Sequence, residues 1–329
     1  MRPAMPASPA PRLRVGFILT PRFTLCAFAN FVDVLRLAAD EGDRSRPILC
    51  RWRVLSATMD PVSSSSGIVV QPEERLGDPT RFDYIVVIGG LMQELETLAP
   101  AYVSFLQRAA AAGVPLVGVC TGAFVLHRAG LMQGYRACVS WFHHNDFLEQ
   151  FTGITPVSDQ IFVVDRDRLT CSGGTSSAQL AAFLVDRHIG RAASKKSLAI
   201  MMIDETMAAE RPQPGMPLEL TTADPLVRKA LLMMQQRLDT PLTVAALADH
   251  LEVSRRKLER HFTEALSLTP SDAGKKIRLA HAELLLSRSE RSVTQVAQDT
   301  GFTDVSHLIR VFRASHGTTP EAWRRAQMA

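Results

Sequence analysis

A cysteine stands at position 120, where an apolar run gives way to small residues. The segment 114–123 reads Val-Pro-Leu-Val-Gly-Val-Cys-Thr-Gly-Ala, which predicts a buried strand, a sharp turn and the start of a helix. Backbone N–H groups and the helix dipole at such a turn favour the thiolate form of a cysteine. The pattern is that of a nucleophile elbow with cysteine in place of serine. Three roles stay open for Cys120: a nucleophile, a wall of a ligand pocket, or a buried structural thiol.

Two glycine pairs follow apolar runs and predict turns whose N–H groups can hold an anion or a carboxylate. Gly89 and Gly90 come after the run 85–88, and a second pair follows Cys171. Either pair can equally be an ordinary turn. Trp141 offers an aromatic face, which attracts cationic groups. These features predict a site for a small amine or amino-acid-like ligand. The predicted ligand-binding residues are Gly89, Gly90, Cys120, Thr121 and Trp141.

A second kind of chemistry lies in the last ninety residues, where arginines sit in a repeated pattern. Residues 243–248 (Thr-Val-Ala-Ala-Leu-Ala) match 292–297 (Ser-Val-Thr-Gln-Val-Ala), and the spacing Leu-x3-Phe recurs at 258–262 and 308–312. The second copy has one extra residue between these two matches. In each copy a Thr or Ser caps a short helix, and a turn leads to a second helix. This order predicts two helix-turn-helix units.

The second helix of each unit is amphipathic. Leu258 and Phe262 share one face, while Arg256 and Arg260 share another. In the second copy, Ser306, His307 and Arg310 take the outward face. Arginines at this spacing pair with guanine edges or phosphates in a major groove. A merely solvated helix face is the alternative for any single arginine, but the duplication favours a shared role in binding DNA.

The elements that would position these residues differ between the two halves of the chain. In the first two hundred residues, apolar strands alternate with helices, which predicts a mostly parallel sheet covered on both faces. The predicted strands are 15–19, 53–56, 84–88, 116–119, 161–164 and 169–172, with a hairpin around 165–167. The predicted helices between them include 28–39, 101–112 and 177–188. Beyond residue 220 the chain reads as helices at 224–236, 244–251, 255–266, 271–286, 293–300 and 305–315.

A Pro-rich stretch, Glu-Arg-Pro-Gln-Pro-Gly-Met-Pro at 210–217, separates the halves, because it cannot continue a helix. We therefore expect a leader at 1–12, a sensor domain at 13–205, a linker at 206–223 and a DNA-binding domain at 224–329.

Composition narrows the class of protein. The 329 residues are 46% hydrophobic and 21% charged, which excludes a largely disordered chain. No apolar run is long enough to span a membrane, and the first twelve residues lack the apolar core of a secretory signal, so we expect a cytoplasmic protein. The five cysteines form no CxxC pair, and no metal or cofactor is expected. The net charge of +4 permits DNA binding without demonstrating it.

Residues 224–326 resemble the AraC/XylS family of bacterial transcription regulators. The resemblance rests on 301–304 (Gly-Phe-Thr-Asp), on 307–313 (His-Leu-Ile-Arg-Val-Phe-Arg), and on Gly317 and Pro320. It implies two helix-turn-helix units, joined by the helix at 271–286, that enter successive major-groove turns. The DNA contacts that it implies by position are Arg256, Glu259 and Arg260 in the first unit, and Val305, Ser306, His307 and Arg310 in the second. Glu259 would accept from a cytosine amino group or orient Arg256.

Residues 13–205 resemble the DJ-1/PfpI domain of the class I glutamine amidotransferase-like fold. The run 118–126 (Gly-Val-Cys-Thr-Gly-Ala-Phe-Val-Leu) is close to the form found in GlxA-type regulators, which join this domain to an AraC-type tail. Enzymes of the family place a carboxylate at about Ala27 and often a histidine at Ser140, and this chain has neither. The runs 140–144 and 157–165 look like those of regulators of arginine, carnitine or glycine-betaine catabolism.

The resemblances together imply a flavodoxin-like, doubly wound α/β domain with a mostly parallel sheet, followed by an all-α double helix-turn-helix domain. The expected function is sequence-specific transcription regulation, as an activator of a catabolic operon, controlled by an amino-acid-like or quaternary amine effector. Its expected partners are double-stranded DNA, the effector, a second copy of the chain in a homodimer, and RNA polymerase. We expect no enzyme activity. One alternative is a cysteine-dependent hydrolase or amidotransferase-like enzyme that also binds DNA. A third interpretation makes the first domain only a dimerisation scaffold.

Overall fold

The computed structural model describes residues 11–40, 44–151, 156–203, 207–209, 211, 213, 220, 222–238, 240–288 and 291–328. The chain divides into two compact units, Met1–Gln213 and Pro214–Ala329. Residues 1–10 of the expected leader and most of the expected linker at 206–223 lie outside the described residues. No helix within the described ranges has both the length and the apolarity that crossing a bilayer requires.

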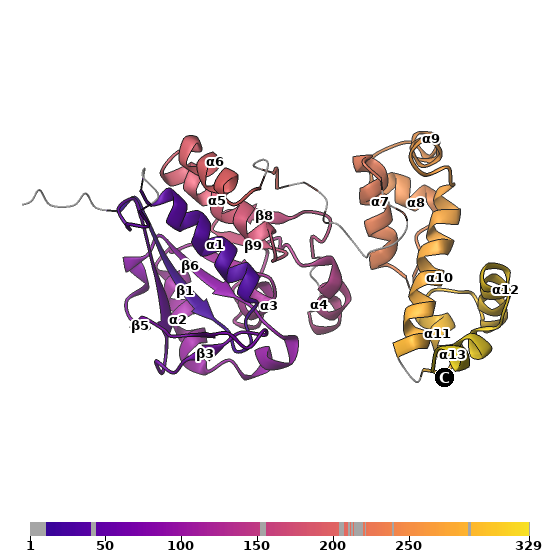
Figure 1. Cartoon of the computed structure of the whole chain (residues 1–329), viewed down its shortest axis with the longest axis horizontal. Helices are drawn as coiled ribbons and strands as arrows, with labels where there is room; N and C mark the ends of the chain where they lie inside the picture. The colour runs from indigo at the N-terminus through magenta and orange to yellow at the C-terminus, as the bar shows by residue number, and fades with distance from the viewer. Residues whose placement is uncertain are drawn as a thin grey trace, which may run out of the picture. The chain divides into compact units, whose positions relative to one another are not determined.

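The first unit is built on a seven-stranded sheet with the strand order β5-β2-β1-β6-β7-β9-β8 (Figure 1). The strands are β1 (Leu13–Leu19), β2 (Cys50–Ser56), β5 (Glu74–Arg75), β6 (Tyr84–Ile88), β7 (Leu116–Val119), β8 (Phe162–Asp165) and β9 (Arg168–Cys171). All neighbours are parallel except β8 and β9, which pair antiparallel as the predicted hairpin. A short antiparallel pair, β3 (Val62–Ser63) and β4 (Val69–Val70), lies outside this sheet. The predicted doubly wound, mostly parallel sheet is confirmed.

Helices cover both faces of this sheet. Its central strands are therefore apolar at consecutive positions, whose side chains point to opposite faces. In β1, Phe17 packs into one core and Ile18 into the other. The first core is closed by α1 (Leu25–Ala38), α5 (Ser176–His188) and α6 (Arg191–Ile200). The second is closed by α2 (Pro100–Ala111), α3 (Gly122–Arg128) and α4 (His144–Gln150). The turns that follow the carboxyl ends of the strands lie at one edge of the sheet, which is where ligands bind in folds of this type.

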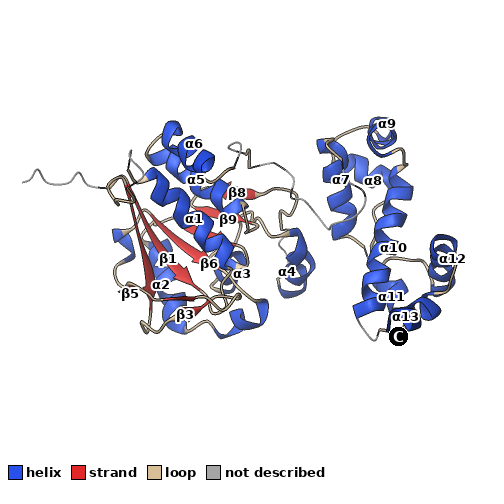
Figure 2. Cartoon of the chain, in the orientation of Figure 1, coloured by secondary structure: helices blue, strands red, loops and turns tan. Residues whose placement is uncertain are grey.

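The second unit consists of helices and loops in its described residues (Figure 2). The helices are α7 (Pro225–Gln236), α8 (Val244–His250), α9 (Arg255–Leu266), α10 (Pro270–Arg288), α11 (Val293–Asp299), α12 (Val305–His316) and α13 (Pro320–Met328). The long α10 serves two small cores. Ile277 packs with Leu258 and Phe262, while Ala282 packs with Leu308 and Phe312. The two predicted helix-turn-helix units and their connecting helix are therefore present.

Element bounds differ from the sequence-based ones where tertiary contacts extend an element. Strand β2 begins at Cys50, earlier than predicted, because 50–55 pairs residue by residue with β1. Helix α6 was not predicted. Its mixed run Ala-Ala-Ser-Lys-Lys-Ser is weakly apolar, yet Ser194 and Ser197 are fully buried and donate to carbonyls of Ala182 and Ala193.

Candidate DNA-binding surface and ligand pockets

The first helix-turn-helix unit is α8 and α9. Thr243 caps α8 by accepting from the Ala246 amide at 3.1 Å, and Ser254 caps α9 by accepting from the Lys257 amide at 3.2 Å. Between the helices Glu252 adopts the left-handed conformation, with φ 54°. A non-glycine residue rarely does so. The turn is therefore held by the packing of its neighbours rather than by local preference.

Helix α9 buries Leu258 and Phe262 and exposes its arginines, as predicted. Arg256 is exposed, and its guanidinium has no hydrogen-bond or ion-pair partner among the described residues. Glu259 accepts from Arg255 at 2.8 Å, so in the free protein it orients Arg255 and not Arg256. Arg260 lies 3.8 Å from Glu264. The helix thus exposes three arginines: Arg256 is unpaired within the described residues, Arg260 is loosely paired, and Arg255 is hydrogen-bonded to Glu259.

A hydrogen bond between two side chains anchors α9 to the start of α7. His261 Nδ1 lies 2.7 Å from Asp224 Oδ2, and Asp224 also caps α7 by accepting from the amides of Leu226 and Val227. Burial opposes ionisation of this carboxyl group, but the hydrogen bonds outweigh it and lower the pKa of Asp224. The carboxylate therefore stays charged and fixes the orientation of the first recognition helix.

The second helix-turn-helix unit, α11 and α12, repeats this arrangement with a different turn. Ser292 and Gln295 form a capping box on α11, and Asp304 caps α12 by accepting from the His307 amide at 2.7 Å. Gly301 takes the left-handed position, with φ 64°. Its carbonyl accepts from the Arg278 guanidinium of α10 at 2.7 Å. The extra residue of this copy lies in the turn, as predicted from the repeat.

Helix α12 is fixed on its inner side and open on its outer side. Leu308 and Phe312 are buried, and His316 stacks on Phe312 and lies 2.9 Å from Glu283 of α10. The outer side forms a shallow hollow of about 470 Å³. Its lining residues are Ser306, Ile309, Arg310, Arg313 and Ala314. Arg310 and Arg313 are exposed without side-chain partners in the described part of the chain.

Two of the residues expected to contact DNA from α12 are only half-exposed. Val305 packs against the core of its unit. His307 lies edge-on to Phe302 and 3.4 Å from the Thr303 hydroxyl. Arg291 is held by Asp299, so its guanidinium already has an anionic partner. Ser306 and Arg310 are the exposed members of the expected second set.

In the first compact unit of the chain, Met1–Gln213, the backbone at Cys120 is strained, as it is at a nucleophile elbow. Its φ is 57°, in the left-handed region. Gly173 makes the turn possible, since a Cβ there would lie 2.8 Å from the Cys120 Cβ. A Cβ at Gly118 would likewise lie 2.8 Å from the Ala123 amide nitrogen. The predicted strand, sharp turn and helix at 116–128 are confirmed.

The surroundings of the Cys120 thiol are poor in bases. Its one hydrogen-bond contact among the described residues is the Thr24 hydroxyl, 3.5 Å from Sγ. Ala27 is fully buried on α1, and Ser140 caps the short helix Trp141–His143 by accepting from the Phe142 amide. Cys120 itself is half-buried. The described geometry therefore shows a thiol at an elbow without an imidazole or a carboxylate hydrogen-bonded to it.

The glycines at 89 and 90 serve close backbone packing. The Gly89 amide donates to the Val119 carbonyl at 3.0 Å, so it is not an open anion donor. A Cβ at Gly89 would lie 2.2 Å from the Gly122 nitrogen. The Thr121 hydroxyl donates to the Gly90 carbonyl at 2.7 Å and is buried. The Gly89 amide and the Thr121 hydroxyl are therefore already paired within the protein and are not open to a ligand.

Trp141 is half-buried, and its backbone is tied to the end of the first unit. Its amide donates to the Gln213 side-chain carbonyl at 2.8 Å. The adjacent histidines have separate partners: His143 Nδ1 lies 2.6 Å from Asp146, and His144 Nδ1 lies 2.8 Å from the Ser158 hydroxyl. The two imidazoles therefore do not act together.

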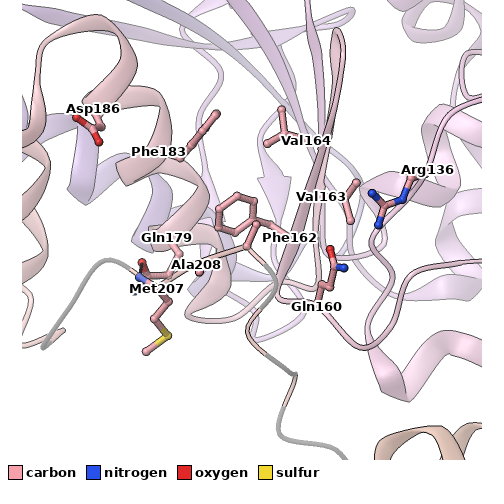
Figure 3. Close-up of a pocket in the computed structure, with 11 residues that line it drawn as sticks. Arg136, Gln160, Phe162, Val163, Val164, Gln179, Phe183, Asp186, Met207 and Ala208 are labelled. Atoms are coloured by element: carbon pink, nitrogen blue, oxygen red, sulfur yellow. Dashed lines mark hydrogen bonds between the residues drawn. The ribbon is translucent and has the colours of Figure 1, made fainter. Parts of the chain in front are cut away.

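A pocket that the sequence did not indicate lies beside the edge strand β8 (Figure 3). It measures about 330 Å³ and is lined by residues from β8, from α5, from the loops before β8, and from 207–209. Its charged lining residues are Arg136 and Asp186. The one periodic signal in the sequence is Gln179, Phe183 and Asp186, which recur at helical spacing on α5.

Comparison with known proteins gives matches to both units. The profile of the DJ-1/PfpI family matches residues 15–187, and that of a helix-turn-helix domain matches 247–326. The chain is 33% identical to the HTH-type transcriptional regulator GbdR of Pseudomonas aeruginosa, over 95% of this chain and 84% of that protein. It is 28% identical to the HTH-type transcriptional regulator GlxA of Rhizobium meliloti, over 95% of each. It is also 32% identical to an isonitrile hydratase of Pseudomonas putida, over 54% of this chain and 73% of that enzyme.

Proposed function

The chain belongs to the transcription regulators that join a DJ-1/PfpI domain to an AraC-type helix-turn-helix domain, and from this premise we propose that its first unit senses a small metabolite and that its second unit activates a catabolic operon. The observation that carries the proposal is the pair of recognition helices, α9 and α12. Each is capped, anchored to α10 or α7, and free on its arginine-bearing face.

The proposed DNA contacts follow from that free face. Arg260 and Arg310 occupy equivalent positions of the repeat, two residues after Leu258 and Leu308. Both are exposed, and Arg256 adds an unpaired guanidinium one turn earlier on α9. Exposed guanidiniums on a recognition helix pair with guanine edges or with phosphates. Ser306 and Glu259 complete the proposed set, while Val305 and His307 would contribute only their exposed edges.

For the effector we propose an amino-acid-like or quaternary amine bound near Cys120, Thr121 and Trp141. The half-buried Trp141 supports a cationic ligand group, because an indole face attracts cations. Gly89 and Gly90 would shape the floor of this site, since the Gly89 amide is already paired. We further propose that the protein acts as a homodimer and recruits RNA polymerase.

Mapping bound DNA across the genome of the source bacterium tests this function. We expect a small number of sites upstream of catabolic genes, and transcription from those genes that rises when the inducing metabolite is supplied. A strain whose protein carries Arg310→Ala is the control, and it should lose the sites without losing the protein. Uniform binding, or transcription that does not respond to deletion of the gene, would contradict the proposal.

A cysteine-dependent enzyme is the second candidate. The observations in its favour are the strained elbow at Cys120 and the similarity of the first unit to an isonitrile hydratase. Against it stands the absence of a hydrogen-bonded base at Sγ within the described residues. We propose that Cys120 is a wall of the effector site and not a nucleophile.

A further inference from the structure

The two recognition helices differ in chemistry at one matched position of the repeat. The repeated Leu-x3-Phe spacing pairs Glu259 on α9 with Ile309 on α12, and both residues are half-exposed. Glu259 accepts from Arg255 at 2.8 Å, whereas the residue of α12 that matches Arg255 is the apolar Val305. One recognition helix therefore carries an ion pair where the other carries a branched hydrocarbon side chain.

Ile309 stands apart from the other large apolar side chains of α12. Leu308 and Phe312 are buried in the core of their helix-turn-helix unit, and Val305 and Val311 pack against that core. Within the described residues, Ile309 belongs to neither of the two small cores. It lines the hollow on the outer side of the helix instead. Its exposed part is therefore removed from water only when a partner covers the hollow.

The hollow is apolar and cationic at once. Ile309 and Ala314 supply hydrocarbon surface, while Arg310 and Arg313 carry guanidiniums without side-chain partners in the described part of the chain. Alanine stands at 314, where the matching residue of α9 is Glu264. The described residues that line the hollow therefore include no carboxylate. Such a surface complements a DNA groove that is flanked by phosphates and exposes a hydrocarbon group on its floor.

We propose that Ile309 recognises the methyl group of a thymine in the major-groove segment that α12 contacts. Thymine alone among the four bases presents a methyl group in the major groove. An isoleucine side chain gains by covering this methyl group and loses by covering a polar group that it cannot pair. Ile309 therefore sets a base preference of its own beside the contacts of Arg310. This role of Ile309 rests on the proposed function, because it names the base that α12 selects.

Removing the methyl group from the DNA tests the contact without altering the protein. The full chain first selects its preferred fragments from a random DNA library. Each thymine of a selected fragment is then replaced in turn by deoxyuridine, which keeps the hydrogen-bonding edge and lacks only the methyl group. We expect one replacement to weaken binding about fourfold, since one buried methyl group is lost. Deoxycytidine at the same position should bind more weakly still, and 5-methyldeoxycytidine should bind more tightly than deoxycytidine.

Variants at position 309 identify the residue that contacts the methyl group. Ile309→Ala should bind the thymine fragment about fourfold or more weakly than the parent chain does, and it should bind the thymine and deoxyuridine fragments equally. Ile309→Val keeps a branched side chain and should retain the preference for thymine. Ile200→Ala, the same change at an exposed position of the first unit, is the matched control and should leave both affinities unchanged. Thermal unfolding of each variant establishes that it is folded.

The opposite results separate the role of Ile309 from the proposed function. A parent chain that binds every deoxyuridine fragment as tightly as the thymine fragment, or that selects sites without thymine, would overturn the role of Ile309 and leave the proposed function standing. A penalty for deoxyuridine that persists in Ile309→Ala would do the same, because another residue would then contact the methyl group. A chain that selects no fragment from the library would refute both.

Discussion

The backbone amide of Trp141 donates a hydrogen bond of 2.8 Å to the side-chain oxygen of Gln213, 72 residues further along the chain. This bond joins the segment expected to contact the effector to the last residue of the first unit. The other end of the same side chain donates to two carbonyls in the unit. The buried side chain of Gln213 therefore ties the end of the first unit to the backbone at Val139, Trp141 and Gln160.

Replacing Gln213 with Ala should destabilise the first unit by about 1–3 kcal/mol, because the partners of the amide are left buried and unpaired. Urea unfolding followed by Trp52 and Trp141 fluorescence in a Trp323→Phe background measures this. Gln133→Ala, at an exposed position, is the control. A loss of unfolding free energy within the error of that control would mean that the Gln213 amide does not stabilise the first unit.

Gly301 and Gly317 form a matched pair in the second unit. Both have positive φ, 64° and 70°. A Cβ at Gly301 would lie 2.0 Å from the Leu238 carbonyl oxygen, whereas a Cβ at Gly317 meets nothing within 4 Å. We expect Gly317→Ala to cost about 1–2 kcal/mol from backbone conformation alone, and Gly301→Ala to cost at least about 1 kcal/mol more. Unfolding followed by Trp323, with the other tryptophans replaced by Phe, compares them. Equal costs would contradict the clash.

His127 makes the first unit sensitive to acid. Burial lowers the pKa of His127 from 6.5 to about 4, and its Nε2 has no partner in the structure. The unfolded chain therefore binds the proton at higher pH than the folded chain does. Stability on the order of 3 kcal/mol is present above pH 6.5 and is lost as the pH falls from about 6.5 through about 4.

The variant His127→Leu should flatten this part of the pH dependence. Burial also lowers the pKa of His188, so some acid sensitivity of the same sign remains. Urea unfolding at pH 7.5, 6 and 5, read from Trp52 and Trp141 in the Trp323→Phe background, gives the slope for each protein. Identical slopes for the variant and the parent would show that His127 does not carry the effect.

Alkylation separates the wall from the nucleophile at Cys120. In a Cys26→Ser background, which removes the exposed thiol, we expect iodoacetamide to label Cys120 slowly at neutral pH, because no base is hydrogen-bonded to its thiol among the described residues. The buried thiols should not compete, because burial raises the pKa of Cys50 to about 12 and of Cys171 to about 11. Mass spectrometry of the peptide identifies the site. Rapid labelling at pH 6 would favour the enzyme.

Much of the fold was predictable because its signals are local. The strands 84–88 and 116–119 are apolar throughout, and the structure has them with those bounds. The caps Thr243 and Ser254 act within three residues of their position. The repeat predicted both helix-turn-helix units, since each buries the same Leu and Phe spacing.

The rest depends on contacts between distant residues. The left-handed conformation at Glu252 could not be predicted, because the position has no glycine to indicate it. The pairing of the Gly89 amide with Val119 follows from the register of β6 and β7, which the sequence does not fix. The pocket beside β8 is lined by Arg136, by Asp186 and by 207–209. These residues lie far apart in the sequence, so no short motif predicts the pocket.

We propose that α9 and α12 recognise a DNA sequence with their exposed arginines. The most direct test is competition binding at moderate salt, in which the purified chain chooses between its genomic fragments and random DNA. We expect a clear preference. Arg256→Ala and Arg310→Ala should each cost about 1–3 kcal/mol on the selected fragment and far less on random DNA, while Lys275→Ala on α10 should cost little on either. No preference for any fragment, or equal losses on both kinds of DNA, would contradict the claim.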